Sequence, residues 1–149
     1  MPITIRPVEA RDLGEVHSMI GQLARHHGDV PRISSAQVQQ QVLDEARARV
    51  LVAEGAGVLA GYALILRRPN LVTGGVGWDI NHLFVRAPLR GQGIGRALIT
   101  AVAALARAEG AEMLLIGALA SNLGAQAAYH AMGLPQLPAA GPRFQVALD

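Results

Sequence analysis

The sequence predicts an α+β fold in which helices flank a mixed β-sheet. Residues 49–68 hold two β-rich runs on either side of a glycine-rich turn, which predicts an antiparallel hairpin. Further along, a strand at 78–85, a helix from Ile94 to about Gly110 and a strand at 113–119 form a βαβ unit, whose two strands must be parallel. A chain of 149 residues suits one domain with a real core but not two ordinary ones, so we expect a single domain over residues 1–149.

The first half begins with a strand and two helices. Residues 3–8, "ITIRPV", alternate as a strand does. Residues 10–27 form a helix, since one face of that segment collects the apolar residues Leu13, Val16, Ile20 and Leu23. Residues 28–33 are a loop, and a serine cap then opens a second helix over 34–47.

The second half holds the hairpin, the βαβ unit and a short last helix. Residues 69–77 are a turn region before the strand at 78–85, and the continuous apolar run at 113–119 predicts a strand covered on both faces. Residues 121–132 form a helix with Ser121 or Asn122 as its cap and Gly133 as its stop. Residues 143–148 alternate weakly, as a last strand would.

Composition and charge exclude several classes of protein. The chain has no cysteine, which excludes disulfides, a cysteine nucleophile and a thiolate metal site. No apolar run reaches about 18 residues and the N-terminus lacks a secretory pattern, so we expect a cytoplasmic protein with no membrane partner. A net charge of +2 is too small to predict nucleic-acid binding. His26, His27 and Asp29 form a surface cluster without further ligands, so we expect no metal.

Charge is unevenly distributed, and a glycine-rich loop lies in the basic part. No acidic residue stands between Asp79 and Glu109, whereas that interval holds Arg86, Arg90, Arg96 and Arg107. Residues 90–99, "RGQGIGRALI", lead through three glycines into a helix, whose free N–H groups and dipole suit a phosphate. A P-loop is excluded because Gly95 is followed by arginine and alanine, and the G-x-G-x-x-G spacing also fails. A solvated basic face and an anion site both fit, and the glycines favour the anion site.

Two motifs resemble those of the Gcn5-related N-acetyltransferase (GNAT) family. The family's Arg/Gln-x-x-Gly-x-Gly/Ala loop is matched by Arg90, Gly93 and Gly95, after the strand "HLFV". A second signature is matched by Asn122, Ala125, Tyr129 and Gly133. The order of the other elements also agrees, so the resemblance covers essentially the whole chain. This sequence departs from the family pattern in the displaced Pro88, in Gln92 and in Leu134.

The resemblance implies a centrally splayed sheet that binds acetyl-CoA as co-substrate, with no metal. The pantetheine arm would pair with the backbone of Leu83, Phe84 and Val85, near an N–H that polarises the thioester carbonyl. The pyrophosphate would bind the loop formed by Arg90, Gly91, Gln92, Gly93, Ile94, Gly95 and Arg96. Asn122 would bind the pantetheine arm, cap its own helix, or do both.

Three residues are candidates for proton transfer. By resemblance Tyr129 is the general acid that protonates the leaving thiolate, although a helical tyrosine can also serve packing alone. Many relatives have a glutamate base at the position of Asn81, which cannot take a proton near neutral pH. We therefore rank Asp79 first and His82 second as base. Strand alternation places Asp79 and Asn81 on one face and His82 on the other.

Two functions remain open from the sequence. The first is an N-acetyltransferase in which an acceptor amine attacks acetyl-CoA directly, and the second is a non-catalytic acyl-CoA-binding or regulatory module. The acceptor is a small-molecule amine or a protein amino group, and the variable loops hold few acids, which disfavours a strongly cationic polyamine. Relatives often pair as dimers, so a homodimer is an open alternative.

Overall fold

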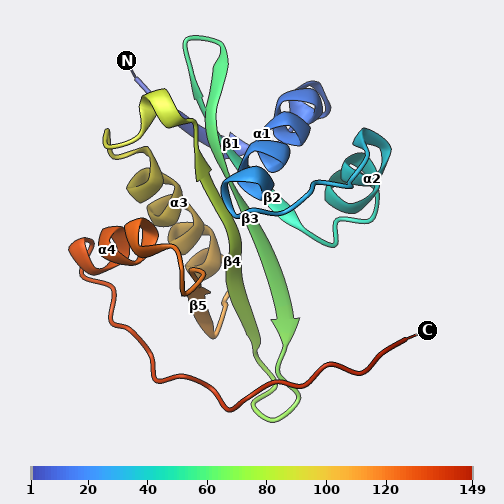
Figure 1. The fold of residues 1–149 in the computed structure, drawn as a ribbon, viewed down its shortest axis with the longest axis vertical. Helices are drawn as coiled ribbons and strands as arrows, with labels where there is room; N and C mark the ends of the chain where they lie inside the picture. The colour runs from blue at the N-terminus through green and yellow to red at the C-terminus, as the bar shows by residue number, and fades with distance from the viewer. Residues whose placement is uncertain (1, 149) are drawn as a thin grey trace. The chain divides into compact units, whose positions relative to one another are not determined.

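Five strands form one open sheet in the order β1-β2-β3-β4-β5 in a computed structural model, which describes residues 2–148 (Figure 1). The strands are β1 (Thr4–Pro7), β2 (Arg49–Gly55), β3 (Val58–Pro69), β4 (Val76–Val85) and β5 (Met113–Ile116). The pairs β1–β2, β2–β3 and β3–β4 are antiparallel, and the pair β4–β5 is parallel. The predicted mixed sheet, the hairpin and the βαβ unit are confirmed.

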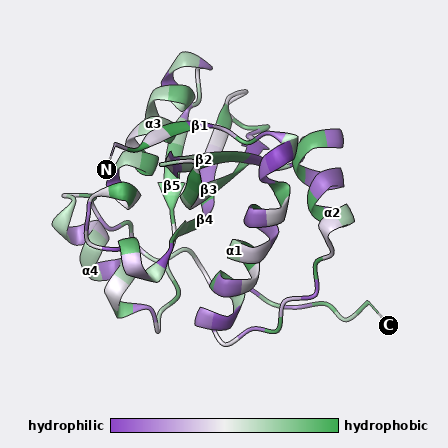
Figure 2. Cartoon of the chain, turned by 90° about the horizontal axis from the view of Figure 1, so that it is seen from above, coloured by the Kyte–Doolittle hydropathy of each residue, from purple (hydrophilic) through white to green (hydrophobic). Residues whose placement is uncertain are grey.

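Helices cover both faces of this sheet (Figure 2). One face carries α1 (Leu13–His26) and α2 (Ser35–Gln39), and the other carries α3 (Ile94–Ala108). Short 3₁₀ helices lie at Ala10–Asp12 and Ala87–Leu89, and a short π-helix lies at Gln40–Asp44. The predicted serine cap is confirmed, because the Ser34 hydroxyl accepts from the Gln37 N–H at 3.1 Å. Over residues 2–148 the structure contains no helix of the length and apolarity that a bilayer crossing requires.

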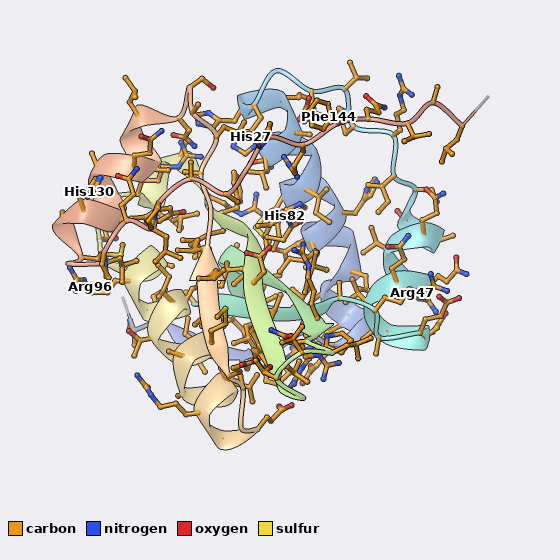
Figure 3. All side chains as sticks on the ribbon, turned by 90° about the horizontal axis from the view of Figure 1, so that it is seen from below. His27, Arg47, His82, Arg96, His130 and Phe144 are labelled. Atoms are coloured by element: carbon orange, nitrogen blue, oxygen red, sulfur yellow. The ribbon has the colours of Figure 1, made fainter. Side chains whose placement is uncertain are left out.

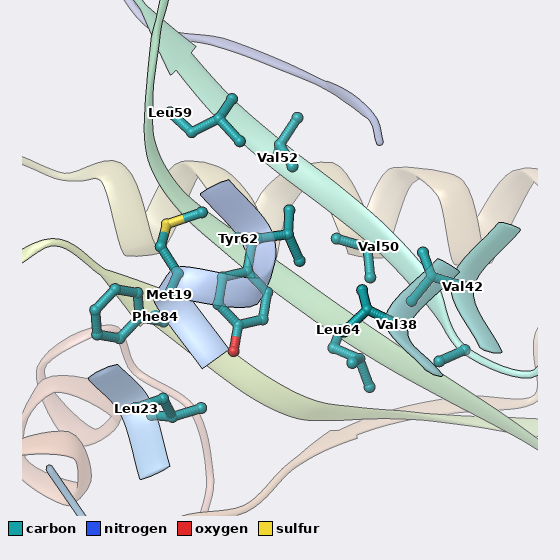
Figure 4. Packing of buried hydrophobic residues seen from close by; sticks show 12 residues of the cluster. Met19, Leu23, Val38, Val42, Val50, Val52, Leu59, Tyr62, Leu64 and Phe84 are labelled. Carbon is teal, nitrogen blue, oxygen red and sulfur yellow. The ribbon is translucent and has the colours of Figure 1, made fainter. Parts of the chain in front are cut away.

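The core consists of two clusters, one on each face of the sheet. We call the first the α1–α2 cluster; its fully buried members include Val16, Met19, Val38, Val52 and Tyr62. The second, the α3 cluster, includes Ala53, Ala63, Ile65, Leu98 and Val102. Strands β2 and β3 contribute to both, because successive side chains of a strand point to opposite faces. Figure 4 shows the first cluster from close by.

Strand β4 contains a bulge, and beyond this bulge its pairing with β5 ends. His82 lies opposite Leu64 on β3, but Ile80 lies opposite Ile65, so Asn81 is an extra residue in β4. The pairing of β4 with β5 runs only from Gly77 to Ile80. From Asn81 onward β4 pairs with β3 and no longer with β5, so the mixed sheet opens between these two parallel strands, in agreement with the predicted fold class.

One predicted strand is shorter than expected, and another does not form. The strand predicted over 113–119 ends at Ile116, and it is not covered on both faces, since Met113 and Leu115 are 49% and 40% exposed. Residues 143–148 form no strand, and Phe144 is exposed. Alternation alone does not make a strand, because the backbone N–H and C=O groups also need a neighbouring strand edge.

The contacts divide the chain into two compact units, Met1–Gly117 and Ala118–Asp149, and the second contains the last helix, α4 (Leu123–Ala131). Of the two predicted cap residues, Asn122 caps this helix, because its Oδ1 accepts a hydrogen bond from the Ala125 N–H at 3.1 Å. Gly133 follows the helix with φ +78°, as a C-terminal stop does. A single domain over residues 1–149 stays a prediction.

Gly61 on β3 lies where the backbone of β4 leaves no room for a side chain. A Cβ added there would collide with the carbonyl oxygen of Phe84. We expect Gly61→Ala to lower the free energy of unfolding by about 1–3 kcal/mol, measured by urea denaturation. Gly14→Ala is the control, because a Cβ at that helical position meets nothing within 4 Å and should stabilise by up to about 1 kcal/mol. A Gly61→Ala protein as stable as wild type would contradict the close approach.

Candidate active site

The glycine loop joins the end of β4 to α3 and leaves its backbone donors free. Gly91 and Gly93 have φ of +77° and +84°, and Gly93 is the N-cap of α3. The first bond of the helix runs from the Ala97 N–H to the Gly93 carbonyl at 3.0 Å. Within the described chain, the N–H groups of residues 91–96 donate to no protein acceptor. Six such donors at a helix N-terminus suit an anion.

The loop also leaves open space beside its free donors. A Cβ added at Gly93 would meet no atom within 4 Å. A Cβ added at Gly95 would come within 3.9 Å of Leu83 and 4.0 Å of Val85, so the first turn of α3 lies beside the end of β4. The glycines therefore keep side chains out of a space that borders both the free donors and the strand.

Arginines around the loop have different tasks. Arg90 Nε donates to the Val85 carbonyl at 2.8 Å and its guanidinium lies 5.6 Å from the centre of the Phe84 ring, so it holds the loop to β4. Arg86 forms an ion pair with Glu15 at 3.4 Å. Arg96 is exposed in the first turn of α3 (Figure 3), and no acidic partner lies within ion-pair distance in residues 2–148. Arg107 lies in the last turn, away from the loop.

Two residues of β4 turn their main chain toward the split. The Arg86 N–H donates to the Ala60 carbonyl at 2.9 Å, so antiparallel alternation directs the main chain of Phe84 to β3 as well. The main-chain groups of Leu83 and Val85 then face the side from which β5 has parted. An extended ligand has room to pair with this edge as a strand does.

The bulge changes which face of β4 each polar side chain occupies. Cross-strand partners share a face, and Asp79 and His82 lie opposite Leu66 and Leu64, which both belong to the α1–α2 side of the core. The prediction that His82 lies on the opposite face from Asp79 is therefore wrong. The extra residue Asn81 shifts the phase of the strand, and simple alternation does not include such a shift.

Asn81 and His82 line a pocket of about 300 Å³ between β4 and the α1–α2 side. The rest of the lining is mostly apolar: Ile20, Ile33, Val38, Gln41, Val42, Ala48, Leu64 and Leu66. Asp79 is outside this lining, with its Oδ2 3.9 Å from Arg68 and its side chain 26% exposed. A larger pocket of about 420 Å³ lies along the outer side of α1 and holds no residue of β4.

Tyr62 is a residue that the sequence analysis missed. Its hydroxyl lies 3.1 Å from Nδ1 of His82, which is half-buried at the centre of β4 (Figure 3). Burial, together with the charge of His27, lowers the pKa of His82 below its ordinary value. The pairing is invisible in the sequence because the two residues come from different strands.

The remaining candidates belong to the second unit. Tyr129 lies on α4 and is half-buried, and its burial raises the pKa of the phenol above the ordinary value. Asn122 caps the same helix. The described residues contain no group of three or more histidine or acidic side chains placed to hold a metal ion.

Comparisons with known proteins agree with this geometry. The chain matches the acetyltransferase (GNAT) family over residues 17–134. No curated protein matches it in the sequence comparison. Many solved structures are similar at the level of the fold.

Three of these structures represent the set. A possible acetyltransferase from Clostridium difficile is 17% identical, with a TM-score of 0.86, and the match covers 99% of this chain and 100% of that one. AAC(6')-Iy, in complex with a bisubstrate analogue of CoA and monomethyl-acetylneamine, is 19% identical at a TM-score of 0.83, with 99% and 100% covered. A ribosomal-protein-alanine N-acetyltransferase from Brucella melitensis is 21% identical, with a TM-score of 0.76. The match covers 99% of this chain and 100% of that one.

The family match spans most of the chain and includes both the glycine loop and α4. Of the two functions that the sequence leaves open, the transferase is the one that this match supports. The chain belongs to the GNAT family of acetyltransferases, and it is an N-acetyltransferase.

Proposed function

We propose that the enzyme uses acetyl-CoA as donor and acetylates a primary amine held in the pocket beside Asn81 and His82. The observation that carries this proposal is the loop of six free N–H groups next to the opened edge of β4. A loop of this kind binds a pyrophosphate, and an opened strand edge binds an extended arm. Coenzyme A contains both parts.

The donor would lie along the loop and β4. The N–H groups from Gln92 to Arg96 bind the pyrophosphate, and the main chain of Leu83 and Val85 pairs with the pantetheine arm. Phe84 contributes its ring beneath Arg90, which holds the loop in place. When bound, acetyl-CoA supplies an activated acetyl group for attack by the amine.

The acceptor would enter from the α1–α2 side. The pocket there is mostly apolar and its lining contains no acidic residue among those described, so it offers little to a polycation. Small amines, amino acids and protein amino groups fit this chemistry. Cytoplasmic location and a homodimer stay predictions.

Two residues would transfer protons. The acceptor arrives as an ammonium group and attacks only after it loses a proton. Asp79 lies on the same face as the pocket but outside its lining, so it takes this proton through an ordered water. Tyr129 gives its hydroxyl proton to the departing thiolate, and in this proposal Asn122 supports the pantetheine arm as well as its helix.

Steady-state kinetics of Asp79→Asn test the proposal, with free coenzyme A as readout and several amines as acceptors. We expect acetylated product by mass spectrometry for wild type. In Asp79→Asn we expect kcat/KM to fall by about tenfold to a thousandfold for every amine, because the amide cannot take the ammonium proton.

Asp44→Asn is the control, since it removes an equal charge from an exposed position and should leave kcat/KM unchanged. A kcat/KM of Asp79→Asn equal to that of wild type with every amine would refute the water relay. Absence of product with every amine would refute the proposed reaction.

A further inference from the structure

The Tyr62–His82 pair lies between the core and the acceptor pocket, and the steps above make no use of it. Tyr62 is fully buried in the α1–α2 cluster, where Figure 4 shows its ring beside Met19 and Phe84. Its hydroxyl reaches Nδ1 of His82 at 3.1 Å, and the two rings meet edge to face, with centres 6.0 Å apart. Among residues 2–148 the hydroxyl has no second hydrogen-bond partner.

The proton of this hydrogen bond belongs to Tyr62. Burial raises the pKa of the phenol, so the group keeps its O–H. A buried O–H without an acceptor is costly, and Nδ1 of His82 is the acceptor within reach. Tyr62 therefore donates and Nδ1 accepts, which requires an Nδ1 without hydrogen. In a neutral imidazole the hydrogen must then be on Nε2.

The other end of the ring is open to the pocket. His82 lines the pocket and is half-buried, and its Nε2 has no partner in the described chain. Asn81 is the other polar β4 residue of this lining. A neutral His82 thus offers the acceptor a hydrogen-bond donor and has no lone pair at Nε2 to take a proton.

We infer that Tyr62 fixes His82 as a hydrogen-bond donor to the acceptor pocket, so that the enzyme prefers amines with an accepting oxygen close to the amino group. This inference depends on the proposed function, because it assumes that the pocket holds the acceptor. An alkylamine would leave the Nε2–H unpaired in a mostly apolar pocket. We expect the resulting preference to be about tenfold to a hundredfold in kcat/KM.

The tautomer can be measured directly on the whole protein by ¹⁵N-correlated NMR of the histidine side chains, with His82 assigned from the spectrum of His82→Gln. We expect the Nε2–H form in wild type and a mixture of tautomers in Tyr62→Phe, which keeps the ring and loses the donor. An Nδ1–H form in wild type would overturn the inference.

Kinetics with a matched pair of amines tests the preference. Glycinamide carries a carbonyl oxygen beside its amine and propylamine does not. Because glycinamide is the weaker base, each amine is compared between wild type and variant at one pH, and not with the other amine. In His82→Gln, which keeps an N–H donor and cannot act as a base, we expect kcat/KM for glycinamide to recover most of what His82→Leu loses. In His82→Leu we expect the loss of about tenfold to a hundredfold for glycinamide alone.

The outcomes separate the two proposals. If His82→Gln loses activity as fully as His82→Leu, and for both amines, then His82 is a base and the inference fails. A kcat/KM for glycinamide in His82→Leu equal to that of wild type would also overturn it. If neither amine nor any other is acetylated, the proposed function fails, and the NMR spectrum still decides the tautomer of His82.

Discussion

Replacing Gly93 with valine is expected to abolish coenzyme A binding, with a loss of affinity of at least about a hundredfold. Two effects act together. The added side chain occupies the open space next to the free N–H groups, where no atom now lies within 4 Å of the Cβ position. The φ of +84° is also strained for a β-branched residue, so the N–H groups of the loop shift away from their present directions.

Gly74→Val controls for the loss of stability that a valine at positive φ causes anywhere in the chain. Gly74 has φ +80° and also has open space around its Cβ position, but it lies in the β3–β4 turn, away from the loop. The variant therefore introduces a similar backbone strain and leaves the glycine loop unchanged. We expect Gly74→Val to be destabilised and to retain wild-type affinity for coenzyme A.

Calorimetry with coenzyme A, on proteins shown to be folded by their thermal transitions, makes the comparison. A folded Gly93→Val protein with unchanged affinity would exclude the loop as the pyrophosphate site. Equal losses in both variants would attribute the effect to lost stability, and the assignment of the pyrophosphate to the loop would then fail.

Local features of the site follow from the sequence, and paired features do not. The loop at Gly91 and Gly93 is predictable because a left-handed backbone and a helix start depend on neighbouring residues alone. The cap at Asn122 is local in the same way. The bulge at Asn81 depends on the register against β3, which no single segment determines.

The sequence nevertheless contains one signal of the bulge. In "WDINHLFV" the apolar residues Trp78 and Ile80 occupy even positions, whereas Leu83 and Val85 occupy odd ones. All four pack on the α3 side of the sheet, which is possible only if the phase shifts between them. This shift moved His82 to the face of Asp79. Tyr62 had no such trace, because its partner lies on a different strand.

Tyr129→Phe is the second large expected effect, and it concerns the leaving group. A thiolate must receive a proton at some stage, and a phenol is a suitable donor because it is protonated at neutral pH. Burial raises the pKa of Tyr129 further, so the donor form persists to higher pH than for an exposed tyrosine. The hydroxyl carries this role alone, since the rest of the ring serves packing on α4.

We expect kcat to fall by about tenfold to ten-thousandfold in Tyr129→Phe, while the affinity for coenzyme A changes little. The ring remains, so the helix keeps its packing, and the loss appears in the chemical step. His130→Ala, at an exposed neighbouring position on the same helix, should stay within about twofold of wild type.

Single-turnover kinetics with a pre-bound donor gives the decisive rate, because product release then has no influence. The protonated phenol also predicts that wild type keeps its rate as pH rises through the ordinary tyrosine range, since the raised pKa delays loss of the donor proton. A single-turnover rate in Tyr129→Phe equal to that of wild type would assign Tyr129 to packing, and the thiolate would then leave unprotonated or take its proton from water.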